Sequence, residues 1–143
     1  MSDPPLPPRS WLFVPGDSER KQARALGGGA DALILDLEDS VDPAQLPGAR
    51  ARVAGLLKAA APARTGPALW VRVNSLASGL LPVDLAAVCA GALPAGVMLP
   101  KVSAPEELVE VARQLGALEA RHGIVAGTTR LLVLTTETPL GVP

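Results

Sequence analysis

The 143-residue chain is 48% hydrophobic and 19% charged with a net charge of −1, a composition that allows a core and argues against disorder. Basic and acidic residues are interspersed, and two Trp and one Phe are its only aromatic residues. This excludes a nucleic-acid interface, which needs a basic stripe and stacking aromatics. Cys89 is the only cysteine, so an internal disulfide is excluded and this residue is predicted to be a small buried hydrophobe.

The chain opens with segment 1–8, which contains four prolines and one acidic residue. We predict that this segment is flexible. It has neither the basic start nor the apolar stretch of a signal peptide. No apolar run in the chain approaches the roughly 20 residues that a membrane span needs. The expected location is therefore cytoplasmic, without membrane contact.

Five short runs of β-branched and large aliphatic residues are predicted to form strands. The runs are nearly continuous rather than alternating, which is typical of strands buried on both faces of a parallel sheet. In chain order they are Trp11–Val14, Ala32–Leu37, Leu69–Val73, Gly96–Leu99 and Leu131–Leu134.

Helices are predicted between these runs. The first follows Asp17, the expected N-cap, and ends at the glycines 27–29. An apolar stripe at helical spacing runs through Leu46, Ala49, Val53, Leu56 and Ala60 and predicts the second helix, for which both Asp42-Pro43 and Pro47 are candidate starts. A third helix follows Leu81. The clearest helix follows Ser103, which is expected to form a capping box with Glu106.

Regular alternation of strand and helix fits two architectures, an open doubly wound sheet and a closed eight-stranded barrel. A dinucleotide-binding sheet would carry G-x-G-x-x-G after the first strand, where this chain has Pro15-Gly16-Asp17-Ser18-Glu19-Arg20. The barrel is therefore favoured. A complete barrel takes about 250 residues, so residues 9–143 are expected to be the N-terminal part of one α/β domain, a TIM-type parallel (β/α)8 barrel.

Charged residues follow the predicted strands, at the end where parallel β/α folds assemble their sites. We expect five of them to converge on one rim: Glu38, Asp39, Arg72, Lys101 and Glu137. Asp36 alternates with Glu38, and one of the two is expected to face the helix layer. Lys101 could form a Schiff base, but the neighbouring carboxylates favour an electrostatic role.

These residue types indicate a chemistry. Glu137 is placed to hold Mg²⁺, which uses one or two carboxylates together with waters and substrate oxygens. Arg72 offers a planar fork that matches a carboxylate. A metal beside a carboxylate clamp suits a 2-oxo acid, or an acyl thioester that must form an enolate. His122 is the only histidine, so a histidine-based triad or zinc site is unsupported.

Five motifs, in order, resemble the citrate lyase beta subunit family, which belongs with malyl-CoA and citramalyl-CoA lyases to the HpcH/HpaI aldolase superfamily. The resemblance runs from Arg9 onward. The motifs are Arg9-Ser10-x-Leu12-Phe13-Val14-Pro15-Gly16-Asp17, Gly29-Ala30-Asp31-Ala32-x-Ile34-Leu35-Asp36-Leu37-Glu38-Asp39, Val71-Arg72-Val73-Asn74, Leu99-Pro100-Lys101-Val102 and Glu137-Thr138-Pro139-Leu140-Gly141.

The resemblance implies a barrel that cleaves or forms 3-hydroxy acyl thioesters, as a homo-oligomer that we expect to be a trimer or larger. It implies that Arg72 binds the substrate carboxylate and that Glu137 ligates Mg²⁺. The catalytic candidates are Glu38, Asp39 and Lys101, and Glu137 is also expected to contact the substrate. Glu38 and Asp39 would line the pocket and order metal-bound water or substrate, with Lys101 nearby. Three basic residues could meet the phosphates of coenzyme A or form a solvated helix face: Arg20, Lys21 and Arg24.

The family uses a second metal-binding aspartate on the strand after Glu137, which this chain does not reach. We therefore expect a fragment that alone is neither a stable monomer nor a competent lyase. A free 2-oxo acid aldolase, and a non-catalytic acyl-CoA-binding or interaction module, remain the alternatives.

Overall fold

The computed structural model describes residues 6–62 and 65–135. Their strands are β1 (Trp11–Pro15), β2 (Ala32–Asp36), β3 (Ala68–Arg72), β4 (Gly96–Leu99) and β5 (Arg130–Val133). Their α-helices are α1 (Glu19–Leu26), α2 (Leu46–Ala60), α3 (Leu81–Val88) and α4 (Pro105–Arg121), with short 3-10 turns η1 (Pro43–Gln45) and η2 (Leu76–Ser78). Each of the five predicted strands is present, with ends shifted by at most one residue.

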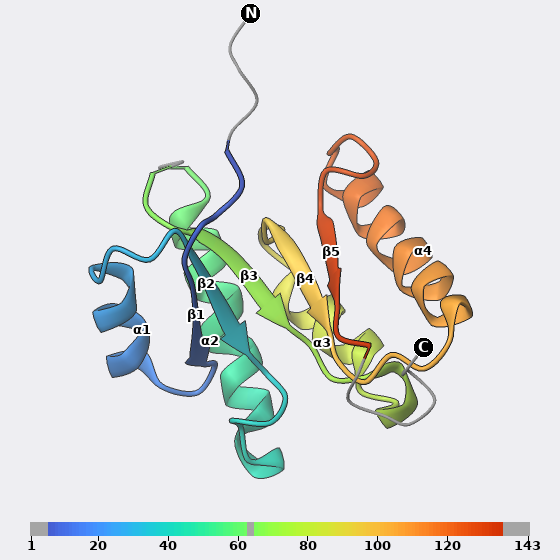
Figure 1. The fold of residues 1–143 in the computed structure, drawn as a ribbon, viewed down its shortest axis with the longest axis horizontal. Coiled ribbons are helices and arrows are strands. Elements are labelled where there is room, and N and C mark those ends of the chain that lie inside the picture. Colours follow the sequence, from blue (N-terminus) through green and yellow to red (C-terminus); the bar gives the residue numbers. More distant parts are fainter. Residues whose placement is uncertain (1–5, 63–64, 136–143) are drawn as a thin grey trace, which may run out of the picture.

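The strands form one parallel sheet in the order β1-β2-β3-β4-β5, so every strand pairs with its neighbour in the chain (Figure 1). The register places Ile34 beside Trp70, and Asp36 beside Arg72. In Figure 1, α2 and α3 lie behind the sheet, with α1 at the β1 end and α4 at the β5 end. In a β/α barrel wall, neighbouring parallel strands are joined by helices that all lie on one side of the sheet, and this sheet has that arrangement.

The strands alternate their side chains between two apolar layers. The larger layer packs the sheet against the helices and includes Leu35, Val71, Val97 and the helix residues Val53 and Val111. The smaller layer lies on the opposite face of the sheet and contains Ala32, Ile34, Trp70 and Met98. Burial on both faces explains why the strands read as continuous apolar runs.

Two helix starts differ from the sequence prediction. The N-cap of α1 is Ser18, whose Oγ accepts from the Lys21 N–H at 3.3 Å, so the expected cap Asp17 is wrong. The predicted box of Ser103 and Glu106 is also wrong by one position. Ala104 is the N-cap of α4, and the Glu107 carboxylate accepts from the N–H groups of Ser103 at 2.7 Å and Ala104 at 2.9 Å. Within the described ranges, no helix is long and apolar enough to cross a membrane.

Candidate functional site at the carboxyl ends of β2, β3 and β4

Four of the five predicted site residues meet at one end of the sheet. Lys101 Nζ lies 2.7 Å from Glu38 Oε2 and 3.7 Å from Asp39 Oδ1, and Arg72 Nη1 lies 3.6 Å from Glu38 Oε1. They come from three strands, because parallel strands bring their carboxyl ends to the same edge. Glu137 lies outside the described residues. The individual roles of these side chains stay predictions.

Asp36 anchors Arg72 through a bidentate ion pair. Arg72 Nε donates to Asp36 Oδ1 and Arg72 Nη2 to Asp36 Oδ2, each at 2.8 Å. Burial alone would raise the pKa of Asp36, but the hydrogen bonds from Arg72, Ser40 and Glu38 outweigh it and hold the pKa at about 2. The same pair raises the pKa of Arg72. Asp36 therefore stays charged, and one edge of the Arg72 fork is occupied.

The expectation that Asp36 or Glu38 faces the helix layer is wrong. Residues two apart along an extended chain point to the same side, and both carboxylates lie beside Arg72. With Nε and Nη2 turned toward Asp36, the Nη1 side of the guanidinium is the part directed at Glu38. A substrate carboxylate would have to bind Arg72 through this second edge.

Phe13 is a site residue that the sequence reasoning missed. The Arg72 guanidinium carbon lies 4.7 Å from the centre of the Phe13 ring, a cation–π distance. Phe13 is 49% exposed and reaches this position from β1. The Arg72 guanidinium is thus hydrogen-bonded along one edge by Asp36 and contacted by the Phe13 ring. The signal available in the sequence was that Phe13 is the only Phe and lies in the first strand.

Glu38 carries the least satisfied polar atom of the site. Its side chain is 6% exposed, and Oε1 is buried without a hydrogen-bond partner among the described residues. Oε2 is paired with Lys101 at 2.7 Å. A buried carboxylate oxygen is costly unless something donates to it or coordinates it. Oε1 therefore marks the point where a cation, a water or a substrate group fits.

Lys101 has a left-handed backbone, with φ at 54°, and is the only non-glycine residue of the described ranges with positive φ. This conformation is unfavourable for a side chain with a Cβ. It turns the chain directly after β4, where the ammonium pairs with Glu38 and Asp39. An ion-paired ammonium supports the electrostatic role over the Schiff-base role.

The donor set fits Mg²⁺ only in part. Among the described residues, no group of three or more His, Cys, Asp or Glu side chains is arranged to hold a metal. The carboxylates of Glu38 and Asp39 both pair with Lys101, and Glu38 Oε1 has no hydrogen-bond partner among the described residues. Mg²⁺ commonly takes one or two carboxylates plus waters and substrate oxygens, so these two residues could supply part of such a site.

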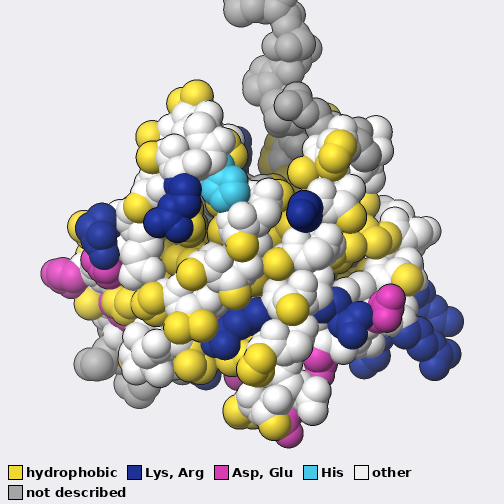
Figure 2. Space-filling model, turned by 180° about the vertical axis from the view of Figure 1, so that it is seen from behind, with side chains coloured by type: hydrophobic (Ala, Val, Ile, Leu, Met, Phe, Trp, Pro, Cys, Tyr) yellow, Lys and Arg dark blue, Asp and Glu magenta, His cyan; other side chains and the backbone are white. Residues whose placement is uncertain are grey.

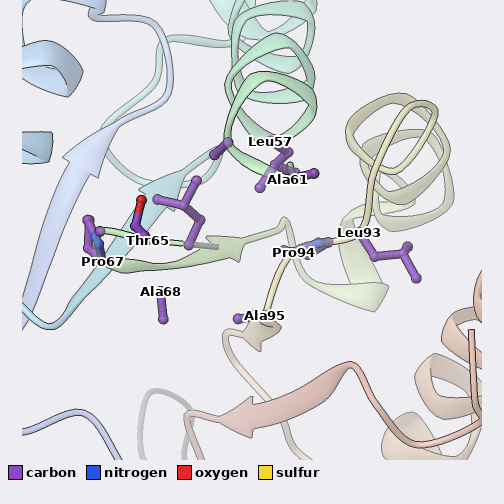
Figure 3. Close-up of a pocket in the computed structure, with 11 residues that line it drawn as sticks. Leu57, Ala61, Thr65, Pro67, Ala68, Leu93, Pro94 and Ala95 are labelled. Carbon is purple, nitrogen blue, oxygen red and sulfur yellow. The ribbon is translucent and has the colours of Figure 1, made fainter. Parts of the chain in front are cut away.

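A hollow of about 350 Å³ lies at the opposite, amino ends of β3 and β4 (Figure 3). The end of α2 and the loops before these two strands line it, with side chains that include Leu57, Ala61, Pro67 and Pro94. None of the described residues that line it is charged. In parallel β/α folds this end serves stability rather than chemistry. The hollow is therefore not part of the candidate site.

The basic residues of α1 lie on the surface. Arg20, Lys21 and Arg24 are exposed, as a solvated helix face requires. Figure 2, which views the molecule from behind, shows basic side chains gathered at the end of the molecule where α1 lies. Contact of these residues with coenzyme A stays a prediction.

The model of the HpcH/HpaI aldolase/citrate lyase family matches residues 9–143. The chain belongs to this family. Mitochondrial citramalyl-CoA lyase of Mus musculus is 39% identical over 104 residues, covering 72% of this chain and 30% of that enzyme. Citrate lyase subunit beta of Escherichia coli K12 is 35% identical over 134 residues, covering 94% of this chain and 43% of that subunit.

Solved structures agree with this membership. A Haloferax volcanii malate synthase with magnesium and glyoxylate gives a TM-score of 0.79 at 16% identity, covering 94% of this chain and 44% of the enzyme, and shows the fold alone. CitE from Mycobacterium tuberculosis, in complex with magnesium, acetoacetate and coenzyme A, gives a TM-score of 0.59 at 32% identity. That match covers 86% of this chain and 38% of CitE.

The prediction of a β/α-barrel fold is confirmed, with five consecutive parallel strands present. The chain spans between 30% and 43% of the two relatives named above.

Proposed function

We propose that this family member acts as a Mg²⁺-dependent carbon–carbon lyase on a 3-hydroxy acyl thioester of coenzyme A. The substrate would be of the citryl-, malyl- or citramalyl-CoA type. The products would be a 2-oxo acid (oxaloacetate, glyoxylate or pyruvate) and acetyl-CoA or a similar thioester. Relatives named citramalyl-CoA lyase and citrate lyase subunit beta support this class of reaction.

One observation carries the proposal: the buried Glu38 carboxylate lies between the cationic side chains of Arg72 and Lys101, and its Oε1 has no hydrogen-bond partner among the described residues. An anionic substrate needs positive charge, and Arg72 and Lys101 supply it. A substrate hydroxyl or a bound water needs an acceptor, and Glu38 Oε1 supplies that. Together these three side chains would provide both the anion-binding and the hydroxyl-binding half of a 3-hydroxy acid site.

In the proposed cleavage, the 3-hydroxyl group loses its proton and the C2–C3 bond breaks. The electron pair of that bond passes to the thioester fragment, which takes up a proton, and the other fragment becomes the 2-oxo acid. Arg72 would orient the substrate carboxylate through its Nη1 edge, since Asp36 fixes the other edge at 2.8 Å. Phe13 would hold the guanidinium plane from above. Preorganised charges of this kind need no rearrangement during reaction.

Glu38 would accept a hydrogen bond at Oε1 while Lys101 keeps its other oxygen paired. Asp39, whose side chain is 63% exposed, would line the mouth of the site and order water. Glu137 would hold Mg²⁺, and Glu38 and Asp39 would order metal-bound water or substrate. When bound, this metal supplies Lewis-acid stabilisation of negative charge on a substrate oxygen. The assembly would be a homo-oligomer, a trimer or larger, which analytical ultracentrifugation can test.

The test uses the full-length protein with citryl-, malyl- and citramalyl-CoA, in the presence of Mg²⁺ or EDTA. Released 2-oxo acid is measured by mass spectrometry. We expect turnover that requires Mg²⁺ and that falls at least about tenfold in Arg72→Lys, because lysine keeps the charge but loses the fork. The matched control is Arg113→Lys, where an arginine makes the same kind of bidentate pair with Glu110 on the exposed side of α4. This control should keep full activity.

The alternatives are outcomes of the same test. Cleavage of a free 4-hydroxy-2-oxo acid, but not of the thioesters, would replace the proposal by a free 2-oxo acid aldolase. Binding of the thioesters without product would indicate an acyl-CoA-binding module. Equal turnover in Arg72→Lys and Arg113→Lys would remove Arg72 from the site.

A further inference from the structure

Behind the site, a buried carboxylate ties three elements together. Asp84 lies in the first turn of α3 and is 0% exposed. It accepts from the backbone N–H of Asn74 at 2.8 Å, from Asn74 Nδ2 at 2.9 Å, and from Arg50 Nε of α2 at 2.8 Å. We call Arg50, Asn74 and Asp84 the Asp84 cluster. None of the three was assigned a role by the sequence reasoning.

The Asp84 cluster reaches the site through one peptide group. Asn74 Nδ2 also donates to the carbonyl oxygen of Leu37 at 3.0 Å. That carbonyl belongs to the Leu37–Glu38 peptide, whose N–H donates to Asp36 Oδ1 at 2.9 Å. Both polar atoms of this peptide are therefore held by side chains. An inner arm, Asp36 with Arg72, holds the N–H, and an outer arm, Asn74 with Asp84, holds the carbonyl.

We propose that Asp84 is a positioning residue: through Asn74 it fixes the Leu37–Glu38 peptide and thereby aims the Glu38 carboxylate between Arg72 and Lys101. A peptide held at one end only can rotate about its axis, which would swing the Glu38 side chain. Holding both ends removes that rotation. The proposal concerns the aim of Glu38, so the part of its test that uses ligand binding rests on the proposed function.

Arg50 holds the Asp84 carboxylate of the outer arm in place. Its Nε pairs with Asp84, whereas its buried Nη2 has no hydrogen-bond partner within the described ranges. The guanidinium is therefore held chiefly by Asp84. The carboxylate in turn lies near the N-terminus of α3, where negative charge is favoured. As a carboxylate paired with Arg50, Asp84 accepts stronger hydrogen bonds from Asn74 than a neutral amide would.

The first readout is independent of activity. Amide hydrogen exchange of residues 37–41 is measured in the full-length protein and in Asp84→Asn. Asparagine keeps the shape but cannot accept from Arg50 and Asn74 together, so we expect exchange in this segment to rise by about tenfold or more, the effect of losing one charged hydrogen bond. The control is Glu119→Gln, a buried carboxylate that accepts from Gly127 N–H at 3.1 Å and Thr129 N–H at 2.8 Å before β5.

Glu119→Gln should leave exchange in residues 37–41 unchanged. If Asp84→Asn does not fold, Asn74→Ala cuts the same arm at a half-buried position and replaces it in the test. Unchanged exchange in residues 37–41 in a folded variant overturns the proposal. So does a rise that is equal in every segment, because that is the result of a general loss of stability.

The second readout is the affinity for oxaloacetate, measured calorimetrically in a double-mutant cycle with Glu38→Gln. If Asp84 acts through Glu38, Asp84→Asn weakens binding about tenfold when Glu38 is present and less than about twofold in the Glu38→Gln background. The proposal is overturned if Asp84→Asn weakens binding by the same factor with Glu38 present and in the Glu38→Gln background. If the unaltered protein binds no oxaloacetate, the cycle is run with glyoxylate or pyruvate. If it binds none of the three, the proposed function fails, and the exchange measurement still decides the role of Asp84.

Discussion

Replacing Asp36 by asparagine should be among the most damaging single changes at the site. Asp36 accepts four hydrogen bonds, two from Arg72 at 2.8 Å and one each from the N–H groups of Glu38 at 2.9 Å and Ser40 at 3.0 Å. Asparagine cannot accept all four, and it leaves the buried Arg72 without its partner. Breaking a buried ion pair on one side costs about 3–5 kcal/mol. Glu38 lies 3.6 Å from Arg72 and would still partly neutralise its charge, so we expect Asp36→Asn to lower the free energy of unfolding by about 3 kcal/mol.

The pH dependence of stability gives this prediction a sharper form. The folded-state pKa of Asp36 is lowered from 3.8 to about 2, so its contribution is present above pH 4 and is lost as the pH falls toward 2. The difference between the two pKa values corresponds to about 2 kcal/mol, of which about 1 kcal/mol is lost by pH 3. Asp36→Asn has no carboxyl group to titrate at this position. The difference in unfolding free energy between the unaltered protein and Asp36→Asn should therefore narrow by about 1 kcal/mol between pH 7 and pH 3.

Urea unfolding followed by circular dichroism at pH 3, 5 and 7 measures this gap in the full-length protein. Asp31→Asn is the matched control, because Asp31 is an exposed carboxylate that accepts from the backbone N–H groups of Arg9 and Ser10. We expect Asp31→Asn to lower the free energy of unfolding by about 1 kcal/mol or less. A gap for Asp36→Asn that is below 1 kcal/mol at pH 7, or that does not change with pH, would refute the assignment of Asp36 as the charged anchor of Arg72.

Further measurements address the packing around the site. Gly16→Ala should cost about 1–3 kcal/mol in urea unfolding, because the new Cβ would lie 2.6 Å from the carbonyl oxygen of Asp36; Gly48→Ala, with open space around the position, is its control. Leu115→Ala should cost about 2–5 kcal/mol by leaving a cavity between α4 and the sheet, and a loss below 1 kcal/mol would contradict this packing. Burial raises the pKa of the Cys89 thiol to about 12, so iodoacetamide at pH 8 should alkylate it only after unfolding, as mass spectrometry would detect.

The strands were predictable because burial on both faces leaves a simple signal. Runs such as Ala32–Leu37 contain few polar residues, and their ends are marked by charge or glycine. The helix caps were less predictable, because Asp17 and Ser18 are both good N-cap residues and stand side by side. The choice between them depends on backbone angles that the sequence does not reveal. At α4 the N-cap is Ala104, which has no side chain that can cap, so the sequence favoured Ser103 and with it Glu106 in place of Glu107.

The rim of the candidate site was predictable from topology, since residues after parallel strands share one edge. What held those residues was not. The pairing of Asp36 with Arg72 depends on the register of two strands that lie 36 residues apart in the chain. The Asp84 cluster joins side chains from two helices and a loop, and nothing at the level of sequence pattern connects Asp84 with Asn74. Glu137 remains a prediction from the motif alone.

The sequential order of the strands has a consequence for how the protein is made. Each paired strand finds its partner between 21 and 36 residues upstream, so its neighbour has already left the ribosome when it emerges. Each of the strands β2 to β5 can therefore pair with the preceding strand before any later strand has been synthesised. Growth of the sheet can therefore keep pace with synthesis, which runs at about 5–20 residues per second, and the Asp36–Arg72 pair can form once β3 docks on β2.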